Sequence, residues 1–163
     1  MFKYGVFSPL QIYGRFVVKE RELYKVASAF RNAIIEAKKS DEFNFRDRMH
    51  RFPVGCCDDS CDLLGFYLWE KYKIHTNERN GYYDVEMTNH VWLITDDKII
   101  IDITGDQFGD KWESVYVGLE IGNYEKFTRV VTQKNFDIRE LPRLWNDYNI
   151  ILKYLNDITV TII

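Results

Sequence analysis

Two neighbouring apolar runs, HVWLI at residues 90–94 and KIIIDIT at residues 98–104, constrain the fold more than any other feature of this chain. Both runs are rich in β-branched residues and they flank the short polar sequence TDD, a pattern typical of two strands joined by a tight turn. They predict an antiparallel hairpin. Because alternate side chains of a strand share a face, His90 and Trp92 are expected on the same face.

Helical periodicity is found in three other segments. Apolar residues recur at helical spacing over residues 20–39, from residue 59 or 60 to about 73, and over about 140–156, where Pro142 is tolerable in the first turn. The second of these helices is expected to begin after the N-cap candidates Asp58, Asp59 and Ser60.

The remaining segments are less regular. Residues 40–55 and 77–82 (NERNGY) have the composition of loops, and short strands are expected near residues 115–117 and 127–131. Helices that precede and follow a group of antiparallel strands predict an α+β fold.

Length and charge limit the class of protein. A chain of 163 residues without repeats or a linker predicts a single domain spanning residues 1–163. Lysine and arginine total 22 against 25 acidic residues, for a net charge of -3, and no block of one sign suggests a nucleic-acid partner. The start MFKYGVFSPL has no signal-peptide pattern and no apolar run suits a membrane partner, so a cytoplasmic location is expected.

Three cysteines lie close together at Cys56, Cys57 and Cys61. Their odd number and the adjacency of the first two argue against a disulfide framework, so reduced thiols are expected. Cys57 lies just before the second predicted helix, where unpaired backbone N–H groups stabilise a thiolate. The neighbouring Asp58 and Asp59 oppose that effect, so a base is needed close by. Cys61 falls on the apolar stripe of the helix and is expected in the core.

His90 is the best candidate for this base, and Asp102 for the group that orients it. A three-residue loop, Thr95-Asp96-Asp97, would pair Ile94 with Lys98 and place His90 directly opposite Asp102. A two-residue loop would instead put the two side chains on opposite faces. A nucleophile, a base and an orienting carboxylate in this order form a generalised catalytic triad, so Cys57, His90 and Asp102 are the candidate catalytic residues.

Supporting roles are expected for three further side chains. Trp92 would shield the imidazole and carboxylate from water. Gln107 would either donate to an oxyanion or satisfy loop backbone, and Asp59 would either cap the helix or brace the nucleophile loop. The backbone N–H of Cys57 would be another oxyanion donor.

At these residues the sequence resembles a known superfamily. A cysteine at a helix N-terminus, a histidine on a strand and an aspartate on the next strand resemble the core of papain-like and transglutaminase-like cysteine enzymes. The segments FPVGCCDDSCDLLGFYL, HVWLI and IDITGDQF are most similar to a group of small bacterial proteins, over residues 52–108. Cys57 matches the cysteine of their pattern, whereas Cys56 replaces the usual serine and Asn89 precedes the histidine. The resemblance implies a thioester-type acyl-enzyme.

The predicted function is cysteine-dependent hydrolysis of a protein or peptide amide, as a peptidase or a glutamine deamidase. Such chemistry requires no cofactor and no metal. One alternative is acyl transfer to an amine, and another is that Cys56 is the nucleophile. Outside this class, the chain would be an inert binding module or would hold a structural zinc ion on Cys56, Cys57, Cys61 and His90, although adjacent cysteines seldom ligate one tetrahedral ion.

Overall fold

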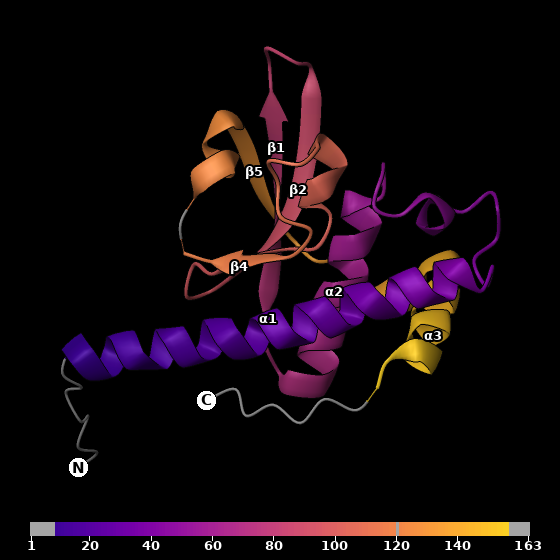
Figure 1. Ribbon diagram of the computed structural model, residues 1–163, viewed down its shortest axis with the longest axis horizontal. Coiled ribbons are helices and arrows are strands. Elements are labelled where there is room, and N and C mark those ends of the chain that lie inside the picture. The colour runs from indigo at the N-terminus through magenta and orange to yellow at the C-terminus, as the bar shows by residue number, and fades with distance from the viewer. Residues whose placement is uncertain (1–8, 120, 157–163) are drawn as a thin grey trace.

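The computed structural model describes residues 9–119 and 121–156 of the chain, with side chains from residue 19 onwards. Its α-helices and its sheet confirm the predicted α+β class (Figure 1). The helices are α1 (Pro9–Lys39), α2 (Cys57–Tyr72) and α3 (Pro142–Tyr154). The strands are β1 (Thr76–Tyr83), β2 (Thr88–Thr95), β3 (Ile100–Asp102), β4 (Tyr116–Gly118) and β5 (Arg129–Lys134).

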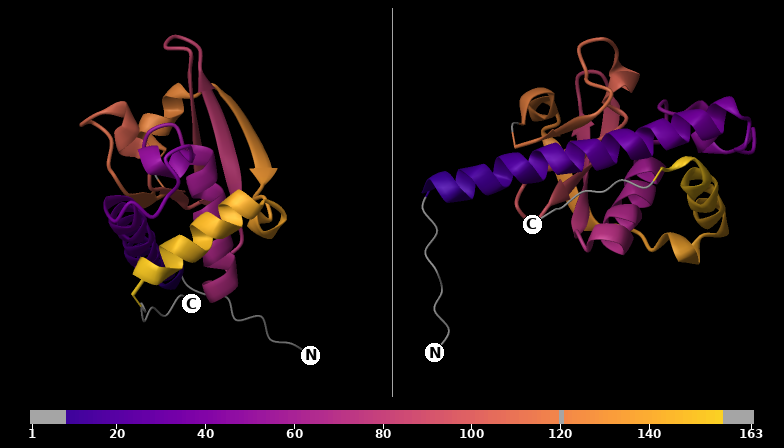
Figure 2. Two further views of the ribbon diagram at one scale, coloured as in Figure 1. Left: turned by 90° about the vertical axis from the view of Figure 1, so that its right-hand side faces the viewer. Right: turned by 60° about the horizontal axis from the view of Figure 1, so that its bottom comes forward.

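All strand pairs are antiparallel, and the order across the sheet is β4-β3-β2-β1-β5. Helix α2 packs on β2 and β1, whereas α1 contacts β3, β4 and α3. Figure 1 shows α1 crossing the molecule roughly perpendicular to β1 and β2, and Figure 2 shows α3 beside α2.

Strand β2 is buried on both of its faces. Val91 and Leu93 belong to the main hydrophobic core, which the three helices share with the sheet. Trp92 belongs instead to a second cluster with Ile100, Tyr124 and Phe127. Because residues alternate along a strand, His90 lies on the Trp92 face, beside the second cluster.

The largest error of the sequence prediction concerns residues 77–82, which are strand and not loop. This segment lies in β1, between β2 and β5. Gly81 pairs with His90, and a Cβ atom at Gly81 would lie 2.7 Å from both the Phe127 Cβ and the Trp92 ring. The glycine that suggested a loop is therefore required by close packing inside the sheet.

The predicted hairpin between β2 and β3 has the right loop length in the wrong place. Leu93 pairs with Ile101, the Thr95 backbone N donates to the Ile99 carbonyl, and the Ile99 N donates to the Thr95 hydroxyl, so the loop is Asp96-Asp97-Lys98. Lys98, with φ of 68°, takes the left-handed position. In this register Trp92 would stand opposite Asp102, and His90 lies diagonal to it on the same face.

The ends of several other elements also differ from the prediction. Helix α1 begins at Pro9 rather than at residue 20, and α3 is slightly shorter than predicted. Helix α2 begins at Cys57 with Cys56 as N-cap, and that cap makes no side-chain hydrogen bond. Asp58, Asp59 and Ser60 are therefore inside the first turn and do not cap it. Strands β4 and β5 lie one and two residues beyond their predicted starts.

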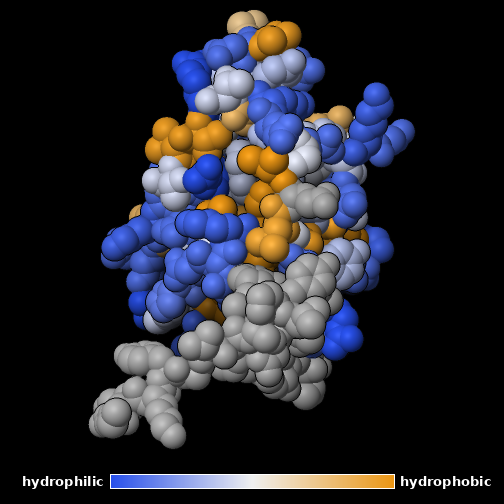
Figure 3. All heavy atoms as spheres, turned by 90° about the vertical axis from the view of Figure 1, so that its left-hand side faces the viewer, coloured by the Kyte–Doolittle hydropathy of each residue, from blue (hydrophilic) through white to orange (hydrophobic). Residues whose placement is uncertain are grey.

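The outer surface shows no dominant hydrophobic face in the view of Figure 3, where hydrophobic residues lie in separate patches among hydrophilic ones. Within the described ranges, no helix combines the length and the apolar character needed to cross a bilayer.

Candidate active site

The imidazole of His90 and the carboxylate of Asp102 form a buried pair. The His90 Nε2 atom lies 2.6 Å from Asp102 Oδ2, and the two residues are 0% and 2% exposed. The diagonal register is sufficient for this contact because both side chains share one face of the sheet. With Nε2 engaged by Asp102, the other ring nitrogen, Nδ1, is left for a partner on the nucleophile side.

Cys57 is the first residue of α2, and its side chain is among the groups that act on the imidazole of His90. Burial alone would lower the pKa of His90, but the charge and hydrogen bond of Asp102, together with a hydrogen bond to Cys57, raise it to about 9. The structure therefore brings Cys57, His90 and Asp102 into one contiguous group. Such an arrangement favours proton transfer from the thiol to the imidazole.

Asp102 is held as an anion by donors on several sides. Its Oδ1 accepts from the Thr104 backbone N at 2.8 Å and the Thr104 hydroxyl at 3.1 Å, and its Oδ2 accepts from the Tyr124 hydroxyl at 2.8 Å. Burial would raise the pKa of Asp102, but the charge of His90 and these hydrogen bonds lower it. Burial and the Asp102 charge raise the pKa of Tyr124, which therefore remains a donor.

Sequence reasoning missed both Thr104 and Tyr124. Thr104 follows Asp102 by two positions, the spacing at which an aspartate commonly accepts from the following backbone, so this signal was present. Tyr124 comes from η3 (Gly122–Lys126), and no pattern in the sequence links that segment to Asp102.

Aromatic rings enclose the imidazole. Trp92, predicted to shield the pair, is buried with its ring 5.8 Å from that of His90. Four further rings have centroids 5.0–6.3 Å from the imidazole, namely Phe108, Trp112, Tyr124 and Phe127. This enclosure keeps water from competing for the hydrogen bond between His90 and Asp102.

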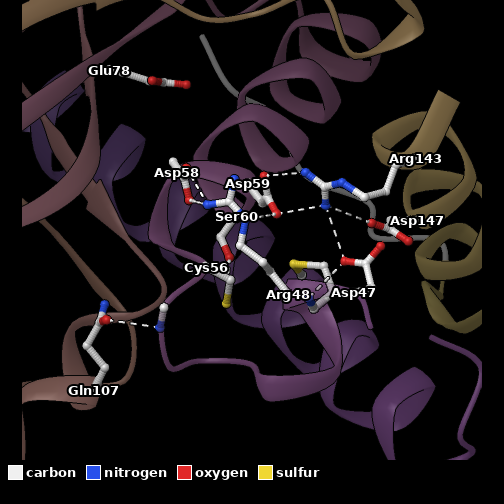
Figure 4. Close-up of polar contacts among 12 residues, drawn as sticks. Asp47, Arg48, Cys56, Asp58, Asp59, Ser60, Glu78, Gln107, Arg143 and Asp147 are labelled. Atoms are coloured by element: carbon white, nitrogen blue, oxygen red, sulfur yellow. Dashed lines mark hydrogen bonds and ion pairs between the residues drawn. The ribbon is translucent and has the colours of Figure 1, made fainter. Parts of the chain in front are cut away.

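Gln107 connects the imidazole with the loop before Cys57. Its Nε2 lies 3.4 Å from His90 Nδ1 and donates to the Thr104 carbonyl at 3.0 Å, while its Oε1 accepts from Gly55 N at 3.4 Å. Figure 4 shows the carboxamide facing the backbone of that loop. The preceding residue, Asp106, is held by Arg31 of α1, which donates to its two carboxylate oxygens at 2.7 and 3.1 Å. Gln107 is thus placed beside the reacting groups.

The other two cysteines have environments that disfavour a thiolate. Cys56 is fully buried, and burial raises its pKa to about 12, although the Ser60 hydroxyl donates to its sulfur at 3.8 Å. Cys61 lies in the core, where burial and the charges of Glu78 and Asp102 raise its pKa well above the usual range. Among the described residues, Cys57 is the thiol that acts on the imidazole of His90 and raises its pKa.

Asp59 does not cap α2 and is paired instead with Arg143 of α3. Its carboxylate accepts two hydrogen bonds from Arg143, at 2.8 and 2.9 Å, and makes none to helix N–H groups as a cap. In the part of the chain that the structure describes, no group of three or more His, Cys, Asp or Glu side chains is arranged to hold a metal ion.

A cavity of about 540 Å³ lies away from these groups, lined by Phe66, Trp69, Phe136 and neighbouring residues. None of Cys57, His90 and Asp102 lines it, so the candidate site rests on the geometry of the three side chains and not on a pocket.

Comparison with protein-family models finds no match, and the comparisons with curated proteins and with solved structures likewise find none.

Proposed function

We propose that this protein is a cysteine-dependent acyl-transfer enzyme that hydrolyses an amide of a protein or peptide. The observation that carries the proposal is a buried imidazole that is hydrogen-bonded to Asp102 through Nε2, with Cys57, the first residue of α2, among the groups that raise its pKa. The resemblance to papain-like and transglutaminase-like enzymes supports the same chemistry, with a nucleophile helix packed on a sheet that carries the base and its orienting carboxylate on adjacent strands.

In the proposed reaction, the thiol of Cys57 gives its proton to His90 Nδ1 and the sulfur attacks the carbonyl carbon. The tetrahedral intermediate collapses to a thioester as the amide C–N bond breaks, and His90 protonates the leaving amine. A water molecule, deprotonated by His90, then cleaves the thioester and releases the acid. Asp102 keeps the imidazole oriented and balances its positive charge throughout.

Negative charge on the carbonyl oxygen needs hydrogen-bond donors during attack. The first N–H groups of an α-helix have no partner within the helix, and that of Cys57 is beside the sulfur. The Nε2 of Gln107 is the second candidate donor, since it already faces the imidazole. One of its two protons is bonded to the Thr104 carbonyl, and the other faces His90 Nδ1, which no longer accepts it once that nitrogen has taken the thiol proton.

The experiment is acylation by p-nitrophenyl acetate combined with alkylation by iodoacetamide, because neither reagent requires the natural substrate to be known. We expect a burst of p-nitrophenolate and a single acetylated or carbamidomethylated residue, Cys57, identified by peptide mass spectrometry. The Cys57→Ala variant should lose the burst, whereas Cys56→Ala and Cys61→Ala should keep it. Faster modification of Cys56 or Cys61 than of Cys57 in the wild-type protein would overturn the proposal.

A further inference from the structure

The first turn of α2 carries two carboxylates beside the nucleophile, Asp58 and Asp59. Acidic side chains suit the N-terminus of a helix, but a negative charge one or two residues from a thiolate disfavours it. A helix that serves to stabilise the Cys57 thiolate would therefore be weakened by its own sequence, unless both carboxylates are neutralised.

Each of these carboxylates has a guanidinium of its own (Figure 4). Arg48 Nη1 donates to both oxygens of Asp58, at 2.7 and 2.9 Å, and Arg48 Nε lies 3.5 Å from Asp59. Arg143 makes the bidentate contact with Asp59, and these hydrogen bonds are the main reason that its pKa is raised. A paired carboxylate exerts a much weaker field on its neighbours than a free one.

Arg143 also connects three elements that are distant in the sequence. It projects from α3 and lies 3.2 Å from Asp47 and 3.6 Å from Asp147, in addition to Asp59 of α2. Asp47 in turn caps η1 (Arg48–Arg51) by accepting from Met49 N at 3.0 Å. The start of α2 is thus fastened to the preceding loop and to α3 through one side chain.

The two ion pairs, Arg143 with Asp59 and Arg48 with Asp58, differ in how deeply they are buried. The side chains of Asp59, Asp47 and Asp147 are 4%, 6% and 2% exposed, so Arg143 compensates buried charge. The side chains of Arg48 and Asp58 are 43% and 44% exposed, so that pair is screened by water. Arg143 is accordingly expected to matter more than Arg48.

We propose that Arg143, assisted by Arg48, is a positioning residue for Cys57: it neutralises Asp59 and holds the first turn of α2 so that the helix N-terminus stabilises the thiolate. This inference rests on the proposed function.

The charged groups around Cys57 are then His90 and Asp102 from the sheet, Asp58 and Asp59 from α2, Arg48 and Asp47 from the preceding loop, and Arg143 and Asp147 from α3.

The test is the pH profile of Cys57 alkylation by iodoacetamide in the full chain, followed by mass spectrometry. In Arg143→Gln the unpaired Asp59 should move the midpoint upward by about one pH unit, which is about tenfold slower alkylation at pH 7. Arg143→Lys keeps the charge and should recover part of the shift. The double variant Arg143→Gln/Asp59→Asn removes both charges and should return the midpoint close to that of the wild type.

The surface pair provides a second test should Arg143→Gln not fold. Arg48→Gln should shift the midpoint by a few tenths of a pH unit, and Arg48→Gln/Asp58→Asn should reverse the shift. Arg139→Gln is the matched control, because Arg139 pairs with the exposed Asp137 and contacts neither Asp58 nor Asp59.

The outcomes distinguish this inference from the proposed function. If Cys57 is alkylated preferentially in the wild type but the midpoints are unchanged in the folded charge variants, the role proposed for Arg143 is overturned and the proposed function is not. A shift in the single variants that the double variants do not reverse would also overturn it, because lost structure rather than lost charge would be the cause. Absence of preferential Cys57 alkylation in the wild type would instead overturn the proposed function.

Discussion

Two groups of acidic side chains, one fully buried and one partly buried, lie near the core thiol of Cys61, and their pKa values are shifted in opposite directions. Burial raises the pKa of Cys61 most, followed by the charges of Glu78 and of Asp102. Asp102 accepts hydrogen bonds from His90, Thr104 and Tyr124, and its pKa is lowered. Asp62, in contrast, lies beside Glu78. Its burial, together with the hydrogen bond and the charge of Glu78, raises its pKa to about 8.

The pKa values of Asp102 and Asp62 differ because the two carboxyl groups have different hydrogen-bond partners. Asp102 is surrounded by donors, one of which can carry a positive charge. Asp62 faces a second carboxyl group, and its only donor among the described contacts is the Phe136 backbone N at 2.9 Å. Glu78 accepts from Gln133 at 2.9 Å, and its Oε1 has no hydrogen-bond partner in the described part of the chain unless Asp62 is protonated. The comparison shows that partners, and not burial alone, decide which carboxyl is ionised at neutral pH.

The largest effect is expected for Asp102→Asn. Asn has nearly the size of Asp, but its NH2 group can favour the wrong imidazole tautomer and it cannot balance an imidazolium. Acylation by p-nitrophenyl acetate should slow by about 10- to 10³-fold, less than in a serine triad because a thiol is the more acidic nucleophile. The burst rate is the measurement, with circular dichroism to establish folding. A folded variant that acylates at the wild-type rate would remove Asp102 from the triad.

The contact between His90 and Asp102 was accessible to prediction because it depends mainly on parity. Any odd-length loop between β2 and β3 puts the two residues on one face, so a shift of the loop by one position, as found here, does not separate them. The α+β class followed from periodicity in the same way, and it is the part of the fold that the structure confirms.

Other parts of the site depend on contacts for which the sequence has no local signal. Strand β1 was missed because its residues Asn77, Asn80 and Gly81 are poor strand formers, and their neighbours in the sheet decide the outcome. The start of α2 was misplaced because Asp58 and Asp59 look like caps, whereas their partners are arginines at positions 48 and 143. Tyr124 lies 22 residues from Asp102, and only the tertiary fold brings them together.

An intermediate effect is expected for Tyr124→Phe, which removes one donor to Asp102 and keeps the aromatic ring. Thr104 and His90 still bind the carboxylate, so acylation should slow by about two- to fivefold, and the free energy of unfolding should fall by about 1 kcal/mol. Stopped-flow bursts and urea titrations measure the two quantities. The control is Tyr148→Phe, which loses a comparable hydrogen bond, to Glu70 at 2.7 Å. Equal slowing in both variants would mean that Tyr124 acts only through stability.

The smallest effect is expected at the second carboxyl pair, and it concerns stability alone. The pKa of Asp62 in the folded protein, about 8, is above its unfolded value. The folded state therefore binds a proton more tightly, and this contribution to stability is present below pH 4 and is lost as the pH rises through 8. Because Asp62 is only partly buried, we expect the free energy of unfolding to fall by roughly 1 kcal/mol from pH 5 to pH 8.

In Glu78→Gln the amide can donate to an ionised Asp62, so most of this fall should disappear. Burial raises the pKa of Asp147 to about 7, so Asp147 also makes stability depend on pH. This contribution is the same in the wild type and in Glu78→Gln, and it cancels when their free energies of unfolding are subtracted. Urea unfolding at several pH values gives that difference, and Cys57 alkylation should be unaltered. An equal slope in the two proteins would mean that Asp62 and Glu78 do not share a proton, and the raised pKa of Asp62 would then come from its own burial and not from Glu78.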